Sequence, residues 1–251
     1  MFKDHFSRRA DAYAGHRPDY PAALFDYLAT GAGAREVAWD VATGNGQAAL
    51  ALARHFAQVW ATDASAEQIR AATPHQRVAY GVAPAETSGL ESASVDLITV
   101  AQALHWLDLP RFYAEVLRVL RPGGVIAVWC YHLMSVSPEV DRVLAHFYAD
   151  TIGADWPPER RLVEDGYRSL EFPFAEIQDA PAFSIERLWS VEQVLNYVST
   201  WSAVQRYQRR LGVDPVEAHL APALRGTWGD RNRQRQVGWP ILLRLGIHRP
   251  A

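Results

Sequence analysis

The sequence predicts an α/β fold with a doubly wound, mostly parallel sheet of seven strands. Two observations carry this prediction. Short apolar runs alternate with amphipathic helical patterns through the first half of the chain, as in a sheet that helices cover on both faces. The runs are also too apolar for one face to meet water, which is typical of buried parallel strands. With 251 residues, of which 49% are hydrophobic, the chain is long enough for one large domain with a small cap.

The predicted elements of the first half follow one another in order. Ser65 and Gln68 form a capping-box pattern, which predicts a helix that ends before Pro74. An apolar stripe from Phe112 to Leu120 predicts a second helix, ended by Pro122 and the two glycines that follow it. The expected strands are Glu36 to Val41, Gln58 to Asp63, Arg77 to Gly81, Val95 to Ala101 and Val125 to Tyr131.

Four segments are expected along the chain. They are an amino-terminal lid over residues 1–35, a cofactor-binding α/β core over 36–134, a helical cap or insertion over 135–188, and substrate-side helices with the closing strand over 189–251. In the last segment, Ser190 opens one long helix pattern that runs through Trp201 to Val204. The run from Val237 to Ile247 predicts the closing strand, in which Pro240 suits an edge or a bulge.

Composition argues against several classes of function. Lys and Arg number 25 against 28 Asp and Glu, for a net charge of −3, which is far from the basic surface that binds a phosphate backbone. No apolar stretch has the roughly 20 residues needed to span a bilayer, and the amino terminus lacks the apolar core of a signal peptide. We therefore expect a cytoplasmic monomer or homodimer that binds neither nucleic acid nor membranes.

Metal and thiol chemistry are not expected. The single cysteine, Cys130, lies in an apolar run and is expected to be buried and unreactive. The nine histidines show no spacing that suggests a metal site. No metal is therefore assigned.

The most informative stretch runs from Val37 to Ala49, where a strand ends at an acidic residue and a glycine loop leads into an alanine-rich helix. Gly44 and Gly46 lack a Cβ atom, so the backbone can turn tightly and a ligand can approach it. The spacing Gly44-x-Gly46-x-x-Ala49 also satisfies the dinucleotide fingerprint, with Asp63 about 20 residues further on as the acid for a ribose. The loop alone does not choose between cofactors.

Asp40 favours a cationic cofactor. A dinucleotide would place its pyrophosphate on this loop and on the start of the helix, where the carboxylate of Asp40 would repel it. A cofactor with a positively charged sulfonium and ammonium would be attracted instead. An NAD(P)-dependent oxidoreductase stays open as an alternative, because it uses the same fold and nearly the same loop.

The stretch from Val37 to Ala49 resembles the first motif of class I S-adenosylmethionine-dependent methyltransferases, whose fold is Rossmann-like. Ala101 to Asp108 is similar to the Ala-x-His-Trp segment of the methyltransferase type 11 group, which includes trans-aconitate methyltransferase-like proteins. The resemblance is good as far as Tyr131 and looser afterwards. It implies transfer of a methyl group from S-adenosyl-L-methionine to a small-molecule acceptor, with a carboxylate as one candidate. A non-catalytic S-adenosylmethionine-binding protein would share the same motifs.

The resemblance also implies which residues hold the cofactor. The full expected set is Tyr13, Arg17, Asp40, Ala42, Gly44, Gly46, Asp63, Ala85, Glu86 and Gln102. Asp63 would accept both ribose hydroxyls, or cap the next helix instead. Ala85 and Glu86 match the adenine-contacting turn. Tyr13 and Arg17 would close over the cofactor, the alternative being a solvated arm. Ala42 stands where the family usually has its first glycine, which crowds the loop.

The acceptor site is expected around His105. Open sheets bind ligands outside the carboxyl ends of their strands, and Gln102, His105 and Trp106 follow such a strand. His105 can act as a general base, position the acceptor or form a wall of the crevice. Trp201, in a Thr-Trp-Ser segment that resembles the same group, is expected to line the pocket.

Overall fold

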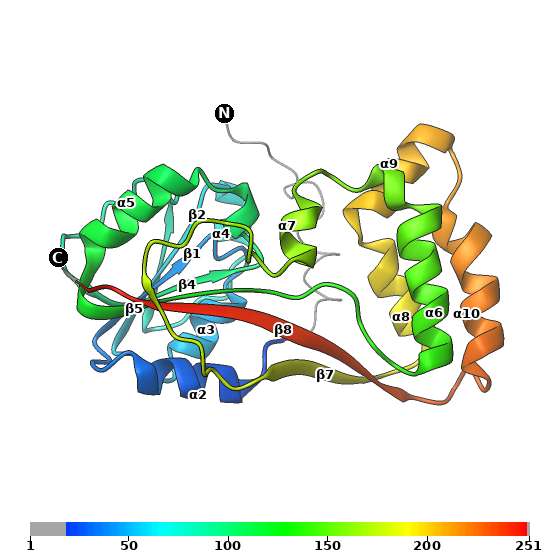
Figure 1. Cartoon of the computed structure of the whole chain (residues 1–251), viewed down its shortest axis with the longest axis horizontal. Coiled ribbons are helices and arrows are strands. Elements are labelled where there is room, and N and C mark those ends of the chain that lie inside the picture. The colour runs from blue at the N-terminus through cyan, green and yellow to red at the C-terminus, as the bar shows by residue number, and fades with distance from the viewer. Residues whose placement is uncertain (1–18, 250–251) are drawn as a thin grey trace.

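A computed structural model describes residues 19–249 as an α/β core with a helical lobe beside it (Figure 1). The core strands are β1 (Val37–Val41), β2 (Gln58–Asp63), β3 (Val78–Val82), β4 (Val95–Ala101) and β5 (Leu120–Cys130). The core helices are α2 (Ala22–Gly31), α3 (Gln47–Leu52), α4 (Ala66–Arg70) and α5 (Leu109–Val119), with a short 3-10 turn, η2 (Leu104–Trp106). The predicted alternation of strand and helix is therefore confirmed.

The helical lobe follows β5 and occupies the other end of the molecule (Figure 1). Its helices are α6 (Pro138–His146), α8 (Val191–Ser199), α9 (Ser202–Leu211) and α10 (Ala221–Trp228), with short turns η3 (Phe147–Thr151), η4 (Gly153–Asp155) and η5 (Val216–Leu220). The short helix α7 (Arg160–Glu164) lies between lobe and core. Within residues 19–249, no helix is both long and apolar enough to cross a bilayer.

Three more strands complete the sheet: β6 (Ala175–Glu176), β7 (Phe183–Trp189) and β8 (Arg235–Ile247). The strand order is β3-β2-β1-β4-β5-β8-β6, and β7 pairs with β8 off this path. Strands β1 to β5 are parallel, whereas β8 is antiparallel to β5. The doubly wound, mostly parallel sheet is confirmed, with seven strands in its main path and an eighth beside β8. One strand of the path, β6, lies in the segment predicted as a helical cap. The order reverses between β1 and β4, so their carboxyl ends form the crevice where open sheets bind ligands.

Successive residues of the core strands face opposite sides of the sheet. Ala38 of β1 and Leu97 of β4 belong to the apolar cluster that includes α2 and α3. The next residue of each strand, Trp39 and Ile98, belongs to the cluster that includes α5. All four side chains are fully buried. Helices therefore cover both faces, which is why these strands are apolar throughout.

Helix α2 is not among the elements expected from the sequence. Its side chains Leu24, Phe25 and Leu28 are buried against the core. Residues 22–31 therefore belong to the core, although the predicted lid extends to residue 35. A lid would be confined to the residues before α2, of which residues 1–18 lie outside the described part of the chain.

The prediction of one long helix from Ser190 is wrong. Helix α8 ends at Ser199, and Trp201 has an extended backbone (φ −65°, ψ 138°) before α9 begins. The side-chain amide of Gln205 donates to the carbonyl of Ser199 (2.8 Å) and so satisfies an acceptor at the end of α8. Trp201 and Val204 are buried on the far side of the break. The apolar pattern therefore continues across it, which conceals the break in the sequence.

The predicted cap over residues 135–188 is only partly helical. It contains α6 and α7, but also β6 and most of β7, and both strands pair with β8. Pro240 of β8 lies opposite Ser184 of β7, beyond the stretch of β8 that pairs with β5. The second half of the chain therefore adds strands to the sheet as well as helices.

Candidate functional site

The glycine loop lies at the carboxyl end of β1 and leads into α3. Ala42, Gly44 and Gly46 all have left-handed backbone conformations, with φ of 51°, 58° and 90°. Gly46 also packs against Tyr80 of β3, since a Cβ atom at residue 46 would lie 2.4 Å from the tyrosine hydroxyl. Space and backbone therefore both require glycine there. At Ala42 the same backbone region costs an L-residue about 1–2 kcal/mol. Alanine in place of the usual glycine therefore strains the backbone of the loop.

Asp40 lies beneath this loop and is 1% exposed. Its two carboxylate oxygens accept hydrogen bonds from the hydroxyls of Thr43 (2.5 Å) and Thr99 (2.7 Å). Burial raises the pKa of Asp40 to about 6, although both hydroxyls and the backbone N–H of Ala49 lower it. The negative charge of Asp63 raises the pKa further. Two carboxyl groups therefore meet at one loop.

The loop offers few amide donors to an anion. Three of its N–H groups already bond within the protein: Thr43 to the carbonyl of Thr62 (3.0 Å), Gly44 to the carboxylate of Asp63 (2.9 Å), and Gly46 to the carbonyl of Thr43 (3.0 Å). A pyrophosphate site depends on such N–H groups. This loop instead gathers carboxylates, which suit an ammonium or sulfonium group. The residues present therefore fit S-adenosylmethionine better than a dinucleotide.

Asp63 ends β2 beside the loop. One of its oxygens accepts the N–H of Gly44, and the other accepts the N–H of Ser65 (2.8 Å). Ser65 caps α4, because its hydroxyl accepts the N–H of Gln68 (3.4 Å). This cap confirms the helix start predicted there. Asp63 therefore joins the two loops, and a carboxylate is the kind of group that accepts hydroxyls from a ligand.

Three further predicted residues, Ala85, Glu86 and Gln102, follow β3 and β4. Ala85 is 7% exposed, and the carboxylate of Glu86 accepts the backbone N–H of Asp108 (3.0 Å), which ties the turn after β3 to the end of η2. The side-chain amide of Gln102 donates to the carbonyl of Tyr131 (2.8 Å) and accepts its N–H (3.3 Å). Gln102 thus extends the pairing of β4 with β5, and a cofactor contact through it stays a prediction.

His105 lies on η2 and contacts Tyr167, which follows α7. Its Nδ1 atom is 2.8 Å from the Tyr167 hydroxyl, and the two rings stack with centroids 5.8 Å apart. The ring of Trp106 lies 4.6 Å from that of His105. Tyr167 is fully buried, and burial raises its pKa well above the usual value. The phenol is therefore neutral, and its hydroxyl orients the imidazole ring.

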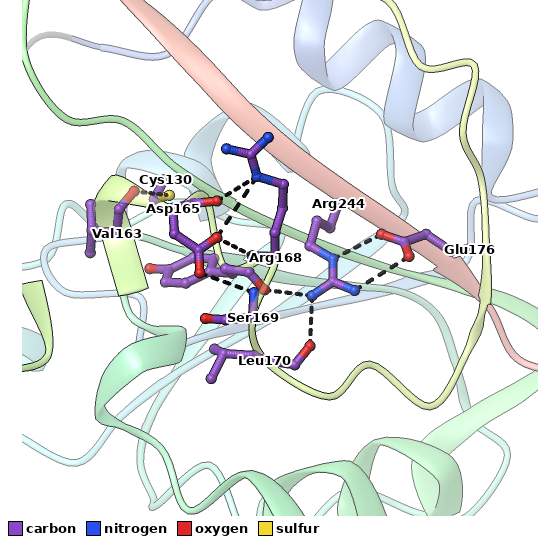
Figure 2. A network of polar contacts seen from close by, with 9 residues as sticks. Cys130, Val163, Asp165, Arg168, Ser169, Leu170, Glu176 and Arg244 are labelled. Atoms are coloured by element: carbon purple, nitrogen blue, oxygen red, sulfur yellow. Dashed lines mark hydrogen bonds and ion pairs between the residues drawn. The ribbon is translucent and has the colours of Figure 1, made fainter. Parts of the chain in front are cut away.

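A polar network holds the segment that carries Tyr167 (Figure 2). The guanidinium of Arg244, on β8, donates to the carbonyls of Tyr167 (2.6 Å) and Leu170 (3.0 Å) and forms an ion pair with Glu176 of β6 (2.8 Å). Tyr167 itself has a left-handed backbone, with φ of 63°. Strand β8 therefore anchors the segment that orients His105.

Cys130 is buried at the end of β5, as the sequence predicts. Its thiol donates to the carbonyl of Val163 in α7 (3.5 Å). Burial raises the pKa of this thiol to about 12, so it is protonated at neutral pH and is not a nucleophile.

An aromatic cluster forms the side of the lobe nearest α7. Trp201 is 9% exposed, and its ring lies 5.9 Å from that of Tyr148 and 5.7 Å from that of Trp156. Arg160, the first residue of α7, lies over Trp156, with 4.6 Å between the guanidinium carbon and the ring centroid. Helix α7 in turn contacts η2, which carries His105. Trp201 is therefore linked to the His105 region through α7.

Two predicted site residues lie outside the described part of the chain, and three residues near the site were not predicted from the sequence. Tyr13 and Arg17 fall outside residues 19–249, so their roles stay predictions. Tyr80 lies near the carboxyl end of a predicted strand, which is a usable signal for a crevice residue. Nothing in the local sequence marks Tyr167 or Arg160, because they reach the site only through the path of the chain after β5.

An open sheet with an acid-flanked glycine loop at its carboxyl edge defines a Rossmann-like protein of the S-adenosylmethionine-binding class. The chain belongs to the S-adenosylmethionine-dependent methyltransferase family. Residues 39–128 match the model of the methyltransferase domain. A Dictyostelium discoideum protein named as a methyltransferase is 33% identical, over 97% of this chain and 95% of that protein. A Mycobacterium tuberculosis relative, also named as a methyltransferase, is 38% identical over 49% of this chain and 51% of its own length.

The solved structures agree with this family. One from Anaeromyxobacter dehalogenans, described as a type II methyltransferase, is 51% identical with a TM-score of 0.88, over 94% of this chain and 99% of that chain. The predicted class I methyltransferase and its fold are thereby confirmed, and the oxidoreductase alternative is set aside. The resemblance to the trans-aconitate methyltransferase-like group stays a prediction.

Proposed function

We propose that this methyltransferase acts on a small-molecule acid, bound between η2 and the aromatic cluster of the lobe. The contact between His105 and Tyr167 carries the proposal, because it orients one polar ring on η2, just after the carboxyl end of β4. Apolar and aromatic walls with a few oriented polar groups are typical of small-molecule sites. Trp106 and Trp201 would supply such walls, from η2 and from the lobe.

The glycine loop and its two acids would hold S-adenosylmethionine. The carboxyl groups of Asp40 and Asp63 would attract its positive charges, and the Asp63 carboxylate would accept the ribose hydroxyls. Ala85 and Glu86 would lie beside the adenine. The other contacts are assigned to Ala42, Gly44, Gly46 and Gln102, with Tyr13 and Arg17 closing over the cofactor as part of the lid.

Methyl transfer requires the protein mainly to bind and orient the two reactants. When bound, the cofactor supplies a methyl group activated by positive sulfur: the lone pair of the acceptor forms the new bond while the carbon–sulfur bond breaks and its electrons return to sulfur. The chain orients the acceptor and excludes water. An ionised carboxylate needs no base, whereas a hydroxyl or amine acceptor would pass its proton to His105. The cytoplasmic location and the monomer or homodimer state stay predictions.

Calorimetric titration with S-adenosylhomocysteine, the demethylated product, tests this function. We expect a dissociation constant near micromolar, worth about −8 kcal/mol, and no response to NADH. Asp63→Ala should abolish the binding, because it removes the acceptor for the ribose hydroxyls and for the N–H of Gly44. Asp179→Ala, at an exposed acid, is the matched control and should bind normally. Normal binding by Asp63→Ala, or binding of NADH alone, would contradict the proposal.

A further inference from the structure

Arg160 is held rigidly at the junction of core and lobe. Helix α7 lies between the two parts (Figure 1), and Arg160 is its first residue. The guanidinium carbon lies 4.6 Å from the ring centroid of Trp156 and 5.4 Å from that of Tyr148. Its Nε atom donates to the Tyr148 hydroxyl (2.7 Å). Three contacts therefore fix the guanidinium plane.

The positive charge of Arg160 has no direct carboxylate partner among residues 19–249. None of the ion pairs there, at up to 4.0 Å, includes it, and its two terminal amino groups donate no hydrogen bond to a described residue. Glu164 reaches it only through Tyr148, whose hydroxyl donates to that carboxylate. By contrast, Arg121 and Arg244 are each paired with a carboxylate. Arg160 thus keeps two donors that no residue of the described range 19–249 engages.

The charge of Arg160 also reaches the predicted acceptor site. Burial raises the pKa values of Cys130 and Tyr167, and the charge of Arg160 opposes that rise. Burial lowers the pKa of His132, and the charge of Arg160 lowers it further. His132 lies beside Tyr148, with ring centroids 6.0 Å apart. The Nδ1 atom of His132 is buried and has no hydrogen-bond partner among the described residues. A guanidinium without a carboxylate partner in residues 19–249 and an imidazole nitrogen without a described partner therefore share one aromatic-walled corner.

We propose that Arg160 binds a carboxylate of the acceptor, and that Trp156, Tyr148 and Trp201 hold its unsaturated or aromatic body. This inference rests on the proposed function and refines it. A carboxylate that accepts two charge-assisted hydrogen bonds is a poor nucleophile, because its lone pairs are engaged. The methyl-accepting atom is then a different group of the same molecule. The acceptor is an acid with a separate hydroxyl, amine or second carboxyl group.

Matched pairs of acids and amides test this assignment. The probes are 4-hydroxyphenylacetate, 4-hydroxycinnamate and their primary amides, titrated into protein saturated with S-adenosylhomocysteine. We expect each acid to bind wild type about tenfold more tightly than its amide, the range of a charged hydrogen bond. Arg160→Met should abolish that preference and leave the amides within twofold of wild type. Arg160→Lys should restore part of it, because a point charge replaces the planar fork.

Arg161→Met is the matched control, since it removes an exposed arginine from the next position of α7 and should retain the preference for acids. Affinity for S-adenosylhomocysteine should be unchanged in all three variants, which shows that each is folded. Equal binding of acids and amides by wild type, no binding of either, or an unchanged preference in Arg160→Met would overturn the assignment. Failure of wild type to bind S-adenosylhomocysteine would instead refute the proposed function.

Discussion

The hydroxyl of Tyr167 lies 2.8 Å from Nδ1 of His105, and this contact joins two residues 62 positions apart in the chain. It connects the core, through η2, to the segment that follows α7. The contact engages one ring nitrogen of His105, so the state of the other nitrogen depends on which partner donates. In the proposed acceptor site, Tyr167 would therefore decide whether His105 acts as a base or as a donor.

Tyr167→Phe should lower turnover about tenfold, because the imidazole loses the group that orients it. Affinity for S-adenosylhomocysteine should stay unchanged, since Tyr167 does not touch the glycine loop. Turnover is measured as release of S-adenosylhomocysteine with any acid that the protein methylates. Tyr113→Phe is the control, because it also loses one hydroxyl hydrogen bond, to the carbonyl of Glu171 (2.9 Å). Equal turnover in the two variants would argue against the role given to Tyr167.

The raised pKa of Asp40 predicts that cofactor binding depends on pH. A cationic ligand favours the ionised carboxylate, so binding should release a proton when the pH lies near or below about 6. Affinity for S-adenosylhomocysteine should then fall about tenfold between pH 7.5 and pH 5. Calorimetry in buffers of different ionisation enthalpy measures the released proton. Asp40→Asn should bind more weakly at pH 7.5 and lose this dependence; a variant that kept it would assign the proton to another group.

The same pKa also affects stability. Because the pKa of Asp40 is raised on folding, the folded state binds more protons than the unfolded state between about pH 4 and pH 6. The contribution of Asp40 to the free energy of unfolding therefore falls as the pH rises through that window. Above it, this carboxylate opposes folding. Urea unfolding of wild type and Asp40→Asn at pH 4.5 and pH 7.5 measures this effect. The free energy of unfolding of the variant, relative to wild type, should be higher at pH 7.5 than at pH 4.5.

Ala42→Gly should raise the free energy of unfolding by up to about 1 kcal/mol. Relief of the left-handed backbone (φ 51°) is worth about 1–2 kcal/mol, and the extra chain entropy of glycine cancels part of it. Urea denaturation measures the change. Ala114→Gly, at an exposed position inside α5, should instead lose about 1 kcal/mol. Parallel losses at both sites would show that the strain at Ala42 is negligible.

Removal of the Asp96 carboxylate should cause a larger loss of stability. One of its oxygens accepts the N–H groups of Glu36 (2.9 Å) and Val37 (2.8 Å), the other pairs with Arg121, and the side chain is 2% exposed. Asp96→Ala should lower the free energy of unfolding by about 3 kcal/mol, because it leaves two backbone N–H groups without their acceptor and the partly exposed Arg121 without its carboxylate. Asp26→Ala, at an exposed acid near His55, should change it by less than about 1 kcal/mol.

The core could be predicted because its signals are local. The strands from β1 to β5 are short apolar runs, and Ser65 marks the start of α4 with its own side chain. The acid-flanked loop is also contiguous, so Asp40, Gly44 and Gly46 could be recognised together. Asp63 lies outside this stretch, but it could be placed because a parallel neighbouring strand ends at the same edge of the sheet.

The second half could be predicted less well because its contacts are distant in the chain. Helix α8 is broken from α9 at Trp201, but the apolar spacing continues across the break. The position of Tyr167 beside His105 depends on its left-handed backbone and on Arg244 of β8, which donates to its carbonyl. Arg160 is one of two adjacent arginines, and only the aromatic rings around it distinguish it from Arg161. Such pairings depend on topology rather than on local pattern.

Strand β8 has a mechanical consequence. Its second half, from Leu242 to Ile247, pairs with β5 of the core, and its first half, from Arg235 to Ile241, pairs with β7 near the lobe. The single strand β8 therefore runs from the core at one end of the molecule to the lobe at the other (Figure 1). A swing of the lobe away from the core would require β8 to bend and its pairing with β5 or β7 to shift, so we expect the two ends to move together. We therefore expect ligands to enter and leave through small displacements of short elements at the site rather than through separation of the lobe from the core.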